Sequence, residues 1–129
     1  MEMVSMRAKE LFGTALDWAV AKAEGYIDDP ESWLYGASLK EVEASTFRPR
    51  ENWSVGGPLI EREKIQLTPL NQDNPKYGWA AAYKDRGEWG DDLYSVHRQR
   101  GITPLVAAMR CFVAAKLGDT VQVPQGLLP

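Results

Sequence analysis

Few residues in this 129-residue chain have the types and spacing that catalysis needs. The single histidine, His97, lies in a glycine-flanked basic segment, and no set of metal-ligand residues recurs at a suitable spacing. No nucleophile motif supports a Ser-His-Asp arrangement. Glu61 and Glu63 flank Arg62 and would share one face of a strand, where paired carboxylates can act as acid and base. A solvated edge is the simpler interpretation, so we favour a non-enzymatic protein without metal or cofactor and leave catalysis open.

The spacing of basic residues is better suited to binding an anion. Arg98, Arg100 and Gly101 lead directly to Thr103, where a helix is expected to begin. A helix N-terminus presents unpaired N–H groups and a partial positive charge, and both favour phosphate. The segment matches no named phosphate loop. An ordinary capped helix with a basic lead-in therefore remains the alternative.

A second candidate lies around Gly56 and Gly57, which are followed by Pro58. Paired glycines let a backbone turn sharply or pass close to a ligand. Trp53, just before them, could stack on a base, and Arg62 could bind a phosphate or carboxylate. The alternative is a tight turn beside a tryptophan of the core.

Arg110 is the most informative charged residue, because it lies in a strongly apolar stretch. A guanidinium cannot be buried there without partners. Three arrangements are open. Arg110 pairs with Asp17 or Glu61, or it faces a pocket and meets an anionic ligand, or it extends its head group to solvent.

Two segments have the pattern of long helices. In the first, residues 14–24, Thr14 is the expected N-cap, Asp17 takes the position of a capping box, and Gly25 ends the helix. The second, residues 104–117, has Thr103 as N-cap, proline at its first position and glycine after its end. Its apolar residues and alanines predict the central helix of the domain.

Proline and glycine punctuate the rest of the chain, between short runs rich in β-branched and aromatic residues. Such runs predict short strands, namely Leu39 to Glu43, Ile65 to Thr68, Trp79 to Tyr83 and an edge strand from Thr120 to Val123 that ends at Pro124. We also expect a helical turn at Asp28 to Glu31 and long irregular loops from Asp85 to Arg100. The predicted fold class is α+β, with two long helices packed on a small antiparallel sheet.

The composition indicates one folded domain over residues 1–129, with 44% hydrophobic and 26% charged residues. A net charge of −3 disfavours sequence-independent binding of nucleic acid. The single cysteine, Cys111, excludes an internal disulfide and is expected to be buried in a reducing compartment. We see no secretory signal in residues 1–9, and the longest apolar run is too short to span a bilayer. We therefore expect a cytoplasmic protein without a membrane partner.

Five tryptophans are more than a core of this size needs. They are spread along the chain at Trp18, Trp33, Trp53, Trp79 and Trp89. We expect several to anchor the core, and one or two to line a concave surface.

Three stretches resemble the NinX-like family of phage and prophage proteins. They are residues 16–22 with Gly25, residues 53–63, and residues 103–110 continuing through 116–119 to Val121 and Val123-Pro124; Trp79-Ala80 is a fourth, shorter anchor. Together they cover most of the chain in the expected order. One departure is Lys64, where family members tend to carry glycine before the strand at Ile65. The resemblance implies a phage or prophage protein and no particular reaction.

These observations favour a non-enzymatic protein that captures a small anionic, nucleotide-derived ligand in the host cytoplasm. Such a ligand could be a host immune signal, in which case its capture would counter host defence. The expected pocket consists of Trp53, Gly56, Gly57, Arg62, Thr103 and Arg110, supported by Asp17, Glu61 and Trp79, with a homo-oligomer interface as a possible location.

The alternative function is a protein-interaction module. Exposed tryptophans such as Trp33 and Trp89 would then bind a host protein. An enzyme acting on nucleotides ranks third. A DNA-binding accessory role ranks fourth, because the net charge opposes it and the sequence contains no helix-turn-helix pattern.

Overall fold

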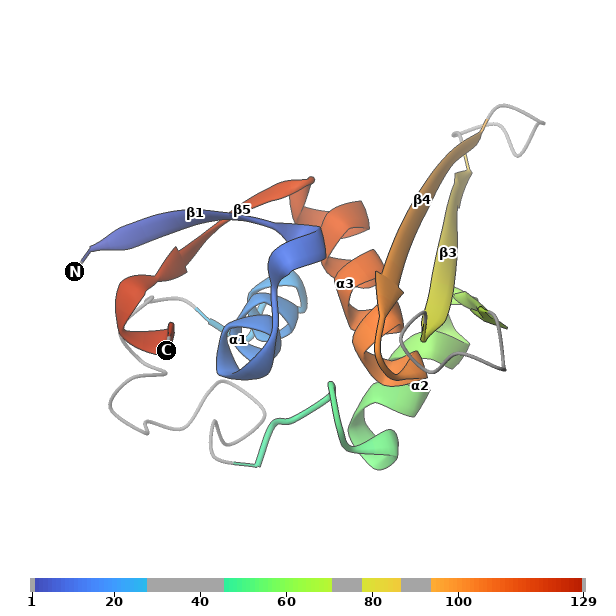
Figure 1. Cartoon of the computed structure of the whole chain (residues 1–129), viewed down its shortest axis with the longest axis horizontal. Helices are drawn as coiled ribbons and strands as arrows, with labels where there is room; N and C mark the ends of the chain where they lie inside the picture. The colour runs from blue at the N-terminus through green and yellow to red at the C-terminus, as the bar shows by residue number, and fades with distance from the viewer. Residues whose placement is uncertain (1, 28–45, 71–77, 87–93, 129) are drawn as a thin grey trace.

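A computed structural model describes residues 2–27, 46–70, 78–86 and 94–128. Within these ranges the fold is α+β, as predicted, but it has three α-helices and two antiparallel sheets (Figure 1). The helices are α1 (Gly13–Ala23), α2 (Trp53–Glu63) and α3 (Pro104–Leu117). One sheet pairs β1 (Met3–Arg7) with β5 (Thr120–Pro124), and the other has the order β2 (Gln66–Pro69), β3 (Trp79–Arg86), β4 (Tyr94–Gly101).

Helix α3 is the central element, as its sequence predicts. It lies between the β1–β5 pair and the β3–β4 pair and packs against α1 (Figure 1). The Thr103 hydroxyl accepts a hydrogen bond from the backbone N–H of Val106 at 3.1 Å, which confirms the predicted N-cap. Most of its apolar residues are fully buried, including Met109, Phe112 and Val113. Its alanines let neighbouring elements approach closely.

Helix α1 begins and ends one residue earlier than predicted, and its predicted cap is wrong. Phe12 is the N-cap residue and gives no side-chain hydrogen bond, while Thr14 lies inside the first turn. Asp17 therefore has no capping role; its side chain is buried and faces Arg50 instead. Gly25 ends the helix in the left-handed conformation, with φ at 80°, as predicted.

Helix α2 is a correction to the sequence interpretation, which placed a tight turn at Gly56-Gly57 and a strand edge at Glu61 to Glu63. Glycine and proline are the poorest residues for a helix interior, so the local pattern argues against a helix here. The Asn52 side chain nevertheless accepts from the backbone N–H of Ser54 at 3.0 Å and caps the helix. Packing of α2 against α3 outweighs the low propensity of its sequence.

Three of the predicted strands are confirmed as β2, β3 and β5. The irregular loop predicted from Asp85 to Arg100 is wrong at both of its ends, because β3 continues to Arg86 and β4 occupies residues 94–101; residues 87–93 lie outside the described ranges. Strand β4 is antiparallel to β3 with Arg98 opposite Ala82. The sequence of β4 is mostly polar, so a search for apolar runs does not find it. Strand β1 was not predicted either.

Several predictions concern residues outside the described ranges. They are the strand at 39–43, the helical turn at 28–31 and the roles of Trp33 and Trp89. The described tryptophans divide by position: Trp18 is fully buried, Trp79 packs half-buried against the core, and Trp53 is 53% exposed. No helix in the described part of the chain is long and apolar enough to cross a membrane.

A small 3-10 turn, η1 (Ala8–Glu10), follows β1 and leads toward α1. The backbone N–H of Ala8 donates to the carbonyl of Asp119 at 2.8 Å, which fixes η1 beside the start of β5. The end of β4 lies close against α3 at Gly101. Only glycine fits there, because a Cβ added at Gly101 would lie 2.4 Å from the backbone nitrogen of Ala107. These contacts hold η1 and the end of β4 against α3.

Candidate functional site

Four of the six residues predicted to bind a ligand lie on α2, where the structure separates their roles. Trp53 is the exposed first residue, Gly56 is buried, and Gly57 and Arg62 follow along the helix. A Cβ added at Gly56 would lie 2.5 Å from the carbonyl oxygen of Pro49 and 2.7 Å from Leu105 Cδ2. The missing side chain of Gly56 therefore lets α2 pack on the first turn of α3.

The other two predicted residues are Thr103, which precedes α3, and Arg110, which lies on α3. Arg110 donates from Nε to the carbonyl of Leu11 at 2.7 Å and from Nη1 to the carbonyl of Arg100 at 2.9 Å. Of the three arrangements left open for Arg110, the ion pair with Asp17 or Glu61 is wrong, since Arg110 makes no ion pair within the described residues. Burial lowers the pKa of Arg110. Its guanidinium links the segment before α1 to the end of β4.

Asp17 is paired with Arg50, which the sequence did not suggest. Arg50 Nε donates to Asp17 Oδ2 at 2.9 Å, and the Arg50 backbone N–H donates to Oδ1 at 3.3 Å. Burial raises the pKa of Asp17 to about 6, although the charge and hydrogen bonds of Arg50 act in the opposite direction. Of the other two supporting residues, Glu61 is exposed and Trp79 is half-buried against the core.

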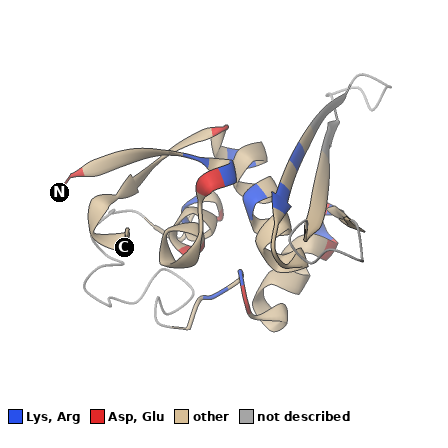
Figure 2. Cartoon of the chain, viewed as in Figure 1, with Lys and Arg blue, Asp and Glu red and all other residues tan. Residues whose placement is uncertain are grey.

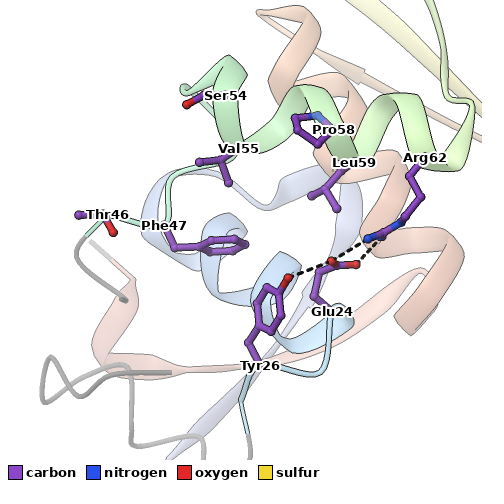
Figure 3. A pocket seen from close by; sticks show the side chains of 9 residues that line it. All are labelled: Glu24, Tyr26, Thr46, Phe47, Ser54, Val55, Pro58, Leu59 and Arg62. Atoms are coloured by element: carbon purple, nitrogen blue, oxygen red, sulfur yellow. Dashed lines mark hydrogen bonds and ion pairs between the residues drawn. The ribbon is translucent and has the colours of Figure 1, made fainter. Parts of the chain in front are cut away.

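A hollow of about 550 Å³ lies between the end of α1 and one face of α2, and we call it the α1–α2 pocket (Figure 3). Tyr26 and Phe47 line it with rings in an edge-to-face arrangement, 5.8 Å between centroids. Helix α2 contributes apolar side chains on the other side. The complete lining is Glu24, Tyr26, Thr46, Phe47, Ser54, Val55, Pro58, Leu59 and Arg62.

The charges at the α1–α2 pocket balance one another. Arg62 makes two hydrogen bonds to Glu24, one of them from Nη1 to Oε2 at 3.0 Å, and a third from Nη2 to Glu63 at 3.2 Å. Lys116 Nζ lies 3.4 Å from the same Glu63 carboxylate. The hydrogen bonds with Glu24 raise the pKa of Arg62. Arg62 is thus already bound by carboxylates and is a poor partner for an added anion.

A second hollow of about 490 Å³ lies where β1 and η1 approach β4, and we call it the basic groove. In Figure 2 lysine and arginine are blue. They occur on β4, on one side of α3, and where β1 leads into η1, on the other side. The lining residues are Arg7, Lys9, Arg98, Gln99, Asp119 and Thr120. The pairing of Arg7 with Thr120 across β1 and β5 fixes one wall.

The basic groove has an excess of positive charge. Its lining contains three cations and one carboxylate, on a chain whose net charge is −3. Within the described residues Arg7, Lys9 and Arg98 make no ion pair. Arg100 is exposed and lies two residues from Arg98 on β4, so both side chains point to the same face of the strand.

Sequence reasoning identified only part of this groove. It selected Arg98 and Arg100 because they lead into the helix at Thr103. It missed Arg7 and Lys9, because they reach the groove only through the pairing of β1 with β5, more than 110 residues away along the chain. No local sequence signal marks that pairing.

The described residues include no group of three or more His, Cys, Asp or Glu that could hold a metal ion. Cys111 is buried, and burial raises the pKa of its thiol to about 12, so it is not a thiolate nucleophile at neutral pH. His97 is half-buried, with its ring centroid 6.1 Å from that of Tyr83.

The chain matches one protein family over most of its length. The family model described as "Bacteriophage P22, NinX" matches residues 7–116. The chain belongs to the NinX family of phage proteins. The NinX match covers α1, α2 and the whole α1–α2 pocket, as well as the three cations of the basic groove. No curated protein sequence matches this NinX chain.

Proposed function

We propose that this NinX-family protein is a phage accessory protein that binds a small anionic ligand of nucleotide type in the basic groove, without converting it. The supporting observation is the separation of charge. Arg7, Lys9 and Arg98 meet one carboxylate, Asp119, in a hollow of about 490 Å³, while the whole chain is acidic. Hollows of this size hold small molecules, and a phosphate accepts strong, charge-assisted hydrogen bonds from arginine and lysine.

The anion is better placed here than on α2, where the sequence first suggested it. Arg62 would have to give up hydrogen bonds to Glu24 and Glu63 before it could bind a phosphate. Arg110, in contrast, uses backbone carbonyls as partners, so its charge has no carboxylate opposite it in the described structure. This charge lies between η1 and β4 and adds to the attraction for an anion.

In a phage protein, capture alone is a sufficient role for such a groove. Binding a nucleotide-derived host immune signal would lower its free concentration and so counter host defence. This role requires only that the Kd lie below the working concentration of the signal. It requires no catalytic residue.

A thermal-shift screen tests the proposal with mononucleotides, cyclic oligonucleotides and ADP-ribose derivatives. A ligand at a hundred times its Kd stabilises the native state by about 2.7 kcal/mol. We expect one class to raise the melting temperature, and Arg98→Glu or Arg7→Glu to abolish the shift. Arg48→Glu is the matched control, because Arg48 is an exposed arginine paired with Glu51 and does not line the groove.

Two results would reject the proposal. If no member of the panel stabilises the protein, or if the groove variants respond as the wild type does, the basic groove is not the site. Recovery of the ligand from heat-denatured protein tests the absence of conversion. Unchanged ligand after prolonged incubation is expected, and a new product would make the protein an enzyme.

A protein-interaction module is the second candidate, because three large apolar side chains are exposed among the residues that the structure describes. Phe12 is 51% exposed, Trp53 53% and Ile102 80%. Large exposed aromatic residues often anchor interfaces. A host protein retained by the wild type after nucleotides are removed, and lost from the Trp53→Ser and Ile102→Ser variants, would favour this function over ligand capture.

A further inference from the structure

The α1–α2 pocket has walls suited to a flat ring. Tyr26 and Phe47 present aromatic rings from the region after α1 and the region before α2, and their planes meet at 87°. Val55, Pro58 and Leu59 of α2 face them across the hollow (Figure 3). Aromatic and aliphatic walls of this kind bury a ring compound and gain its apolar surface.

The polar end of the pocket is an ion pair that is already complete. The dashed lines in Figure 3 join the guanidinium of Arg62 to the carboxylate of Glu24, whose side chain is only 10% exposed. An anionic ligand would have to compete with Glu24 for the guanidinium, and a cationic ligand would have to compete with Arg62 for the carboxylate. An uncharged ligand breaks neither interaction and leaves no buried charge unpaired.

The ion pair is also held in place from behind. Glu63 binds Arg62, and the Arg62 guanidinium carbon lies 5.9 Å from the centroid of the Phe112 ring. Lys116 completes the group through Glu63. A side chain fixed on several sides loses little freedom when a ligand arrives, which lowers the cost of binding.

We infer that the α1–α2 pocket is a second ligand site, which takes an uncharged aromatic or heteroaromatic ring compound. This site is separate from the proposed anion site, because it shares no lining residue with the basic groove. Its ligand is selected by ring shape and by the absence of charge.

Three probes with the same ring and different charges test the inference, namely benzamide, benzoate and benzamidine. Binding is followed by ¹H–¹⁵N NMR titration of the wild-type protein. For ligands of this size we expect a Kd on the order of millimolar. Benzamide should shift the amide signals of Val55, Leu59 and their neighbours, with at least about fivefold higher affinity than either charged probe.

Charge variants then test the role of the ion pair. Glu24→Gln leaves Arg62 with less compensation and should move the preference toward benzoate. Arg62→Gln leaves Glu24 uncompensated and should move it toward benzamidine, each by about fivefold. Arg48→Gln is the control and should keep the wild-type order. Val55→Trp fills the hollow and should abolish benzamide binding, provided that its NMR spectrum shows a folded protein.

The inference is overturned if benzamide shifts amides elsewhere, if benzoate or benzamidine binds the wild type at least as well, or if a folded Val55→Trp variant binds normally. Arg98→Glu separates this result from the proposed function. It should abolish the nucleotide response and leave benzamide binding unchanged. Loss of both responses in Arg98→Glu would show that the two sites are not independent.

Discussion

Asp17 places a titrating carboxyl group inside the fold. Its folded-state pKa of about 6 lies above the ordinary value of 3.8, mainly because burial disfavours the charged form. The folded state therefore binds a proton more tightly than the unfolded chain between these values. By linkage, the contribution of Asp17 to stability is greatest at low pH and is lost as the pH rises through about 6.

We predict that the free energy of unfolding increases as the pH falls from about 7.5 to 5, by roughly 1.4 kcal/mol from this group. Asp17→Asn should flatten that dependence, because asparagine keeps an acceptor for Arg50 and does not titrate. Urea denaturation at several pH values measures both proteins. An equal pH slope in wild type and variant would show that Asp17 is not responsible.

Lys64 has a backbone conformation that ordinary residues adopt at a cost. Its φ is 55° and its ψ 45°, in the left-handed region, and it is the C-cap residue of α2. This conformation costs an L-residue roughly 1–2 kcal/mol, which glycine avoids. Because glycine also makes the unfolded chain more flexible, we predict that Lys64→Gly stabilises the fold by about 0.5–1 kcal/mol. Lys64→Ala keeps the strain, so an equal gain in its urea midpoint would contradict this explanation.

The packing of α2 on α3 depends on Gly56 and can be tested against its neighbour. A Cβ at Gly56 meets the Pro49 carbonyl and Leu105, whereas a Cβ at Gly57 meets only the Trp53 ring at 3.8 Å. We predict that Gly56→Ala lowers the free energy of unfolding by about 1–3 kcal/mol through overpacking. Gly57→Ala should be neutral or stabilising by up to about 1 kcal/mol, because alanine favours a helix. If calorimetry gave the same change in stability for Gly56→Ala and Gly57→Ala, helix propensity and not the close contact at Gly56 would determine the effect.

The elements differ in how far their sequences reveal them. Helices α1 and α3 and the strands β2, β3 and β5 follow from local periodicity, glycine and proline, because each has an apolar face or a clear stop signal. Helix α2 does not, since Gly-Gly-Pro opposes a helix and its packing on α3 outweighs that tendency. Strand β4 is too polar to be recognised by apolar alternation.

The candidate site shows the same division between local and distant information. Arg98 was identified from its place before α3, and Arg62 from its place after Gly56-Gly57; Arg62 lines the α1–α2 pocket, where it pairs with Glu24. The partners of both residues were not predictable, because Glu24 lies 38 residues from Arg62, and Arg7 joins Arg98 only through the folded sheets. Spacing along the chain carries no information about such pairs.

At the scale of the whole molecule, Cys111 reports on complete unfolding. It is fully buried in α3, packed on both sides, and its thiol donates to the carbonyl of His97 at 3.2 Å. We predict that a disulfide reagent such as DTNB does not label the native protein until the domain opens globally. Labelling should therefore speed up with urea in parallel with the unfolding transition measured by circular dichroism. Rapid labelling without denaturant would show local opening of α3.

The dimensions of the basic groove also limit what it accepts. Its hollow of about 490 Å³ is lined by three cations and one carboxylate. A short anion can place all of its charge against this lining, whereas a longer oligophosphate or oligonucleotide has charges that lie beyond the lining and gain no contact with it. In a series of increasing length, binding should therefore strengthen only until the groove is filled, and each unit added after that should bring no further gain.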